Sequence, residues 1–201
     1  MIKIGVLAST NATDMQAIID AIEDGSLDAE ISLLIVNKEN CGAVEKAKKY
    51  NIPYLYINSK DKSREEFDKE ANKALNEHGV QIIFLIGYMR IVTPYLVNEW
   101  RNKILNIHPS LLPKYAGGMD LDVHQEVLNG GEKVTGATLH YVEEEVDAGP
   151  ILFQEEVPIE AGETSDSLKE KVQKVEQGII IKAIRYYSEG KIDIGDTKVK
   201  E

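Results

Sequence analysis

Short apolar runs alternate with amphipathic segments along the first half of the chain. The runs are rich in Ile, Leu and Val and predict strands at 2–8, 29–37, 54–58, 81–87 and 103–108. Between them, apolar residues at three- and four-residue spacing predict helices near 15–24, 41–47, 63–79 and 94–100. Ser63 and Glu66 have the spacing of a capping box, and Gly79 marks the end of the third helix. Unbroken apolar strands separated by amphipathic helices are typical of a parallel sheet covered on both faces.

The pattern changes in the last third of the chain. The stretches "GATLHYVEE" and "PILFQEEVPI" lie close together with a short acidic connection, which predicts antiparallel strands leaving the parallel sheet. A long helix follows at about 164–188, and the tail after it has no pattern beyond a possible short strand. We therefore expect an α/β fold: one doubly wound, mostly parallel sheet with helices on both faces and antiparallel strands added near the C-terminus, in a single domain over residues 1–201.

Composition and charge exclude several classes of function. The chain has no apolar run long enough to span a membrane and no signal-peptide pattern, so we expect a cytoplasmic protein that does not bind membranes. The net charge of −11 argues against binding to nucleic acid, although it permits small anionic substrates in a local site. The single Cys41 excludes an intrachain disulfide, and no Cys, His and Asp spacing is typical of a metal site.

Four segments follow predicted strands and mark where a ligand would bind, because open parallel sheets bind ligands beyond the carboxyl ends of their strands. They are 9–14, 87–92, 106–118 and 142–149. The first, "STNATD", lacks both the glycines of a dinucleotide fold and the Gly-Lys-Ser/Thr of a P-loop. Its helix N-terminus can offer backbone donors to an anion, or Thr13 or Asp14 can simply act as an ordinary N-cap.

Asn106 and His108 are the most suggestive pair in the sequence. Alternation along a strand places them on one face where the strand ends, and Pro109 and Pro113 prevent its continuation. Asp147 lies in the tight turn "DAGP" and is a candidate to orient and charge His108, a pairing that periodicity alone does not establish.

Arg90 follows the most apolar strand and is a candidate for carboxylate recognition, with Met89, Ile91 and Val92 as walls for a flat aromatic ligand. A surface Arg lying over the sheet edge is the alternative. The other histidines have structural interpretations: His124 as a surface or loop-packing residue and His140 as a hydrogen-bonded residue within a strand.

Four motifs together carry a family resemblance: "GYMRIVTP", "NIHPSLLPKY", "GATLHYVEEEVDAGPI" and "VQKVEQ". Collinear over about residues 2–190, the chain resembles the folate-dependent formyltransferases, most of all those that formylate glycinamide ribonucleotide. The resemblance implies transfer of a formyl group from 10-formyltetrahydrofolate, as co-substrate, to the amine of glycinamide ribonucleotide in de novo purine synthesis. It also implies small-molecule substrates, no metal, and a monomer or homodimer.

The resemblance assigns site residues by position in the motifs. The catalytic residues would be Asn106, His108 and Asp147. The folate-binding residues would be Met89, Arg90, Ile91, Val92, Val142, Glu143 and Asp147. The acceptor and its phosphate would be held by Asn11, Ala12, Thr13, Asp14 and Glu176.

Two features depart from the family pattern. Thr10 and Ala12 stand where the family usually has glycines, and Asp14 stands where it has an asparagine. A carboxylate beside a bound phosphate would be repelled unless it points into a cap. The loop at 116–124 is also longer than in the best-known members. Two alternatives follow: another amine acceptor, such as an amino sugar nucleotide, or a folate-binding module without transfer activity, which would not need the Asn106–His108 pair.

Overall fold

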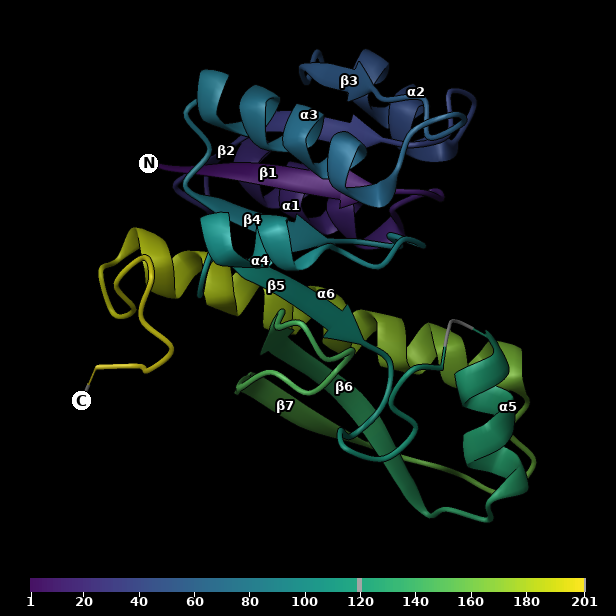
Figure 1. The fold of residues 1–201 in the computed structure, drawn as a ribbon. Coiled ribbons are helices and arrows are strands. Elements are labelled where there is room, and N and C mark those ends of the chain that lie inside the picture. Colours follow the sequence, from purple (N-terminus) through teal and green to yellow (C-terminus); the bar gives the residue numbers. More distant parts are fainter. Residues whose placement is uncertain (119–120, 201) are drawn as a thin grey trace.

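The computed structural model describes residues 1–118 and 121–200, with the backbone alone at 121 and 122. One seven-stranded sheet has the strand order β3-β2-β1-β4-β5-β6-β7 (Figure 1). The parallel strands are β1 (Ile2–Ala8), β2 (Ala29–Val36), β3 (Tyr54–Tyr56), β4 (Ile82–Leu85) and β5 (Ile104–His108). β6 (Val134–Tyr141) and β7 (Ile151–Pro158) continue the sheet as antiparallel strands. The predicted fold class is confirmed.

Helices cover both faces of the sheet. They are α1 (Thr13–Glu23), α2 (Gly42–Lys49), α3 (Arg64–Glu77), α4 (Pro94–Glu99), α5 (Leu121–Asn129) and α6 (Ser165–Ser188). One apolar cluster joins α1, α2, α5 and α6 to one face, and a second joins α3 and α4 to the other. In Figure 1, α3 and α4 lie on the side of the sheet opposite α1 and α6. No helix among the described residues has the length and apolar character needed to span a membrane.

Several local predictions can be compared directly with the structure. The capping box is confirmed: Ser63 Oγ accepts a bond from the Glu66 N–H at 3.1 Å, and Glu66 Oε2 accepts one from the Ser63 N–H at 2.8 Å. The fourth strand ends earlier than predicted, and Gly87 two residues on has a left-handed φ of 59°. The tail has no strand within its described residues 189–200, so that suggestion was wrong.

The N-cap interpretation of the first turn was also wrong. Ala12, not Thr13 or Asp14, is the N-cap of α1, in a left-handed conformation with φ 43° and no side-chain cap. The longer loop expected at 116–124 includes residues 119–120, which lie outside the described residues.

Gly5 allows α3 to approach the centre of the sheet. A Cβ atom built on Gly5 would lie 2.7 Å from Leu75 Cδ2 and 3.0 Å from Val80 Cγ1. Both neighbours are buried apolar side chains of the second cluster. The absence of a side chain at Gly5 therefore sets how closely helix and strand pack.

We expect Gly5→Ala to lower the free energy of unfolding by about 1–3 kcal/mol, because the added methyl group overpacks the core. Gly178→Ala is the matched control: Gly178 lies in α6 with nothing within 4 Å of its Cβ position. It should raise the free energy of unfolding by about 0.5–1 kcal/mol through helix propensity. Urea titrations of both variants would measure this, and equal effects of one sign would contradict the packing argument.

Candidate active site

The four segments predicted at strand ends meet around one cavity of about 360 Å³. Residues from 9–14, 87–92, 106–118 and 142–149 all contribute to its lining, as expected. The cavity lies beyond the carboxyl ends of β1, β4 and β5, where the strand order changes direction. Helix α6 adds Lys169, Gln173 and Glu176 to the lining. The sequence motifs anticipated only Glu176 among these.

Strand β5 delivers Asn106 and His108 to the cavity. The two residues are two positions apart at the end of the strand, and both line the cavity, as alternation predicts. Across the antiparallel pair, Asn106 lies opposite His140 and His108 opposite Thr138. The register of β5 against β6 therefore brings a second histidine next to the Asn106 amide.

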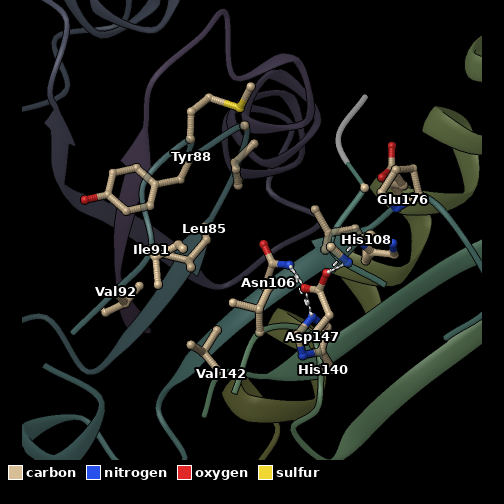
Figure 2. A pocket seen from close by; sticks show the side chains of 18 of the residues that line it. Leu85, Tyr88, Ile91, Val92, Asn106, His108, His140, Val142, Asp147 and Glu176 are labelled. Atoms are coloured by element: carbon tan, nitrogen blue, oxygen red, sulfur yellow. Dashed lines mark hydrogen bonds and ion pairs between the residues drawn. The ribbon is translucent and has the colours of Figure 1, made fainter. Parts of the chain in front are cut away.

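The Asp147 carboxylate joins these side chains (Figure 2). Its Oδ2 lies 3.5 Å from His108 Nδ1 and accepts a hydrogen bond from the Gly117 N–H at 2.8 Å. Its Oδ1 lies 3.4 Å from His140 Nε2 and 3.4 Å from Asn106 Nδ2. The suggested pairing of Asp147 with His108 is therefore present. Asp147 itself has a left-handed φ of 55°, which aspartate tolerates better than most residues.

The pKa of Asp147 is lowered despite its burial. Burial opposes ionisation, but hydrogen bonds from His140 and Gly117 and the nearby His108 ring outweigh it. Asp147 is therefore an anion over the whole physiological pH range. It is the fixed negative charge around which the other groups are arranged.

Burial has the opposite outcome at His108, whose side chain is almost completely enclosed. Loss of hydration lowers the pKa of His108, although Asp147 and a bond to the Tyr115 carbonyl raise it. The Asp147 charge thus acts in the predicted direction but does not dominate. Both ring nitrogens of His108 face an acceptor, because Nε2 lies 3.0 Å from Tyr115 O and Nδ1 faces Asp147. These contacts stabilise the charged ring once it gains a proton.

His140 is a site residue that sequence reasoning missed. Its expected structural bond exists, with Nδ1 3.0 Å from Tyr141 O. That bond places a proton on Nδ1, and Nε2 lies 3.2 Å from Asn106 Nδ2 and 3.4 Å from Asp147 Oδ1. The Asn106 amide N–H₂ is thereby directed at His140 and Asp147, and its oxygen points away from both (Figure 2). Only the strand register could have revealed this contact.

Apolar side chains from 85–92 form one wall. Met89 and Ile91 are about half exposed at the rim, whereas Val92 is buried. The Arg90 guanidinium lies 4.2 Å from the centroid of the Phe67 ring, and its buried Nε has no partner among the described residues. Arg90 is therefore held on an aromatic face, with donors still available.

The first turn contributes Thr10, Thr13 and Asp14 to the lining, while Asn11 and Ala12 do not line the cavity. Burial raises the pKa of Asp14 to about 6, against the opposing effects of a Gln177 hydrogen bond and the charges of Lys46 and Lys169. This carboxyl group is thus poised to exchange a proton near neutral pH.

Two further positions contribute to the lining. His124 is buried on α5 and lines the cavity, so the surface interpretation was wrong. Glu176 on α6 is also buried against the cavity, where the motif comparison located it. Within residues 1–118 and 121–200, no group of three or more His, Cys, Asp or Glu side chains has the arrangement of a metal site.

Comparison with known proteins identifies the family. The formyl transferase model matches residues 2–184. The chain belongs to this family. This formyl transferase is 38% identical over 197 residues to phosphoribosylglycinamide formyltransferase from Haemophilus influenzae, covering 98% of this chain and 92% of that protein.

Longer relatives and solved structures agree. The chain is 40% identical over 196 residues to the trifunctional purine biosynthetic protein adenosine-3 of Gallus gallus, covering 97% of this formyl transferase and 19% of that protein. It spans 14–19% of the length of such trifunctional relatives. The crystal structure of glycinamide ribonucleotide transformylase 1 from Symbiobacterium toebii matches with a TM-score of 0.91 and 35% identity, over 100% of this chain and 93% of that one.

We expect Asp147→Asn to lower the pKa of His108 further, because the substitution removes the charge that opposes the effect of burial. An NMR titration of the His108 ring protons, assigned with His108→Gln, measures the shift. Asp166→Asn, which removes an exposed carboxylate at the start of α6, is the matched control and should leave that pKa unchanged. An unchanged His108 pKa in Asp147→Asn would show that the two side chains are not electrostatically linked.

Proposed function

We propose that this formyl transferase transfers the formyl group of 10-formyltetrahydrofolate to the amine of glycinamide ribonucleotide, a step of de novo purine synthesis. The observation that carries the proposal is the meeting of Asn106, His108 and Asp147 inside the cavity. The named bacterial relative and the solved structure support the choice of acceptor.

The cavity has two chemically different sides, which fits two substrates. Leu85, Ile91, Val92 and Val142 form an apolar side suited to a flat pterin ring (Figure 2). The opposite side has the polar first turn together with Lys169 and Glu176. Asn106 and His108 lie between Val142 and Glu176 in Figure 2, where a formyl group and an amine would meet. Glu176 would accept hydrogen bonds from ribose hydroxyls.

The reaction forms one C–N bond and breaks another. The acceptor amine attacks the formyl carbon, and negative charge develops on the formyl oxygen. The bond from that carbon to N10 of the folate then breaks, and the proton lost by the amine ends on N10. Each step therefore needs a donor for the oxygen and a group that carries the proton.

His108 is suited to the proton transfer. Its lowered pKa keeps the ring neutral at pH 7, so it can accept the proton of the attacking amine, directly or through water. Asp147 then stabilises the charged ring, which can donate to the oxyanion or to N10. For these contacts, His108 Nε2 must exchange its bond to Tyr115 O for one to a substrate.

Asn106 is the second donor to the oxygen in this mechanism. Its N–H₂ group faces His140 and Asp147 in the structure. Donation to the formyl oxygen therefore requires a turn of the amide toward the cavity.

Partners and location follow from the same proposal. The substrates would be small molecules, and the acidic chain would act in the cytoplasm as a monomer or homodimer, without nucleic acid, membrane or metal.

We expect His108→Ala to lower kcat for acceptor-dependent deformylation of the folate by about 100- to 1000-fold, since it removes a donor and the proton carrier. The assay follows a 5-deaza analogue of the folate with and without glycinamide ribonucleotide. His78→Ala is the control, because His78 ends α3 and its Nδ1 contacts Ala74 O, away from the cavity lining. It should retain wild-type activity.

Two outcomes would reject the assignment. Binding of the folate without acceptor-dependent turnover would indicate a binding module or another amine acceptor. Full activity of His108→Ala would exclude His108 from the chemistry.

We also expect Arg90→Ala to raise KM for the folate by about tenfold or more with kcat nearly unchanged, because a charge-assisted bond to the glutamate tail is lost. The matched control, Arg101→Ala, removes an Arg whose side chain bonds Asn98 on the surface. An analogue without the glutamate tail should show no difference between wild type and Arg90→Ala. If Arg90→Ala also weakened binding of that analogue, Arg90 would act on the apolar wall of the cavity and not on the glutamate tail.

A further inference from the structure

We propose that Asp14 determines how the first turn receives the acceptor: the phosphate of the acceptor binds beside a neutral Asp14 carboxyl group, and binding therefore takes up a proton. This inference rests on the proposed function, since it assumes that the acceptor carries a phosphate. It goes beyond that function because it states that the phosphate binds when Asp14 carries a proton.

The position of Asp14 makes it part of any anion site at this turn. It is the second residue of α1, lines the cavity, and is only 7% exposed. Its Oδ1 is buried and has no hydrogen-bond partner among the described residues. A protonated carboxyl oxygen at that place is a donor that needs an acceptor, and a phosphate oxygen supplies one.

Asp14 lies among charges of both signs. Lys46 of α2 and Lys169 of α6 act on it electrostatically, and Glu176 of α6 and His124 of α5 line the same cavity. Lys46 already donates to the carbonyls of Asn11 and Ala12, at 2.6 and 3.2 Å. Lys46 therefore fixes the shape of the turn, and its ammonium group is already bonded to the protein's own backbone.

A phosphate monoester carries a charge of about −1.5 to −2 at pH 7. Placed against this turn, it would meet the carboxylates of Asp14 and Glu176 as well as the two lysines. Protonation of Asp14 removes one negative charge and converts a repelling oxygen into a donor. Of these two carboxyl groups, Asp14 lies in the anion-binding turn itself.

Burial already favours the neutral form of Asp14 in the free protein. With a pKa of about 6, this side chain is neutral in about 1% of free molecules at pH 8. If only that fraction binds the phosphate, the apparent Kd at pH 8 is about 100-fold weaker than the intrinsic one. Below pH 6 the penalty disappears, because Asp14 is then largely neutral in the free protein.

Asp14→Asn tests the proposal, because it replaces the carboxylate by a neutral group of the same size. Calorimetric titration with glycinamide ribonucleotide at pH 5.5 and pH 8, in buffers of different ionisation enthalpy, gives Kd and the number of protons taken up. We expect wild type to take up nearly one more proton than Asp14→Asn at pH 8. The variant should bind up to about 100-fold more tightly there, with the difference nearly gone at pH 5.5.

Asp20→Asn is the matched control. Asp20 is an exposed carboxylate on the same helix that accepts a bond from Gln16, and its removal changes the net charge equally. It should behave as wild type in both Kd and proton uptake. Titration of the phosphate group itself contributes equally to all three proteins and cancels in the comparison.

Other results would overturn the inference. Equal proton uptake by wild type and Asp14→Asn would mean that the carboxylate turns aside without a proton. Weaker binding by Asp14→Asn at both pH values would assign Asp14 to the shape of the turn. In both cases glycinamide ribonucleotide still binds, so the proposed function stands. Absence of binding to every variant would reject both proposals.

Discussion

One carboxylate ties together the parts of the chain that form the site. Asp147 contacts a strand residue of β5, a histidine of β6 and the backbone of the 115–118 segment at the same time. These three pieces are far apart in the sequence and approach one another only because the sheet order places β5 beside β6. A single anion thus connects side chains of β5 and β6 with the backbone of the 115–118 segment.

Dehydration has different outcomes at three ionisable groups of the cavity, and the groups around each one decide the outcome. Donors and the nearby histidines keep Asp147 charged, whereas at Asp14 and His108 burial outweighs the opposing bonds and charges and shifts both toward their neutral forms. The cavity consequently combines one permanent charge with Asp14, whose pKa is raised to about 6, and His108, whose pKa is lowered. A site that must move a proton between substrates benefits from this combination.

Much of this arrangement could be predicted from local pattern. Alternation along a strand was enough to pair Asn106 with His108, and runs of apolar residues located the segments at the strand ends. The role of His140 could not be foreseen, because it depends on which residue of β5 lies opposite it. The N-cap of α1 was also mispredicted, because Ala12 adopts a left-handed backbone conformation that the residue types do not indicate.

The hydrogen bonds made by the 115–118 segment affect whether water can react with the acyl donor. The Tyr115 carbonyl bonds to His108 and the Gly117 N–H to Asp147, so the protein's own backbone occupies these two side chains. In that state neither is available to activate a water molecule against a reactive acyl donor. The acyl donor is therefore protected from hydrolysis until a substrate replaces the Tyr115 carbonyl at His108 Nε2.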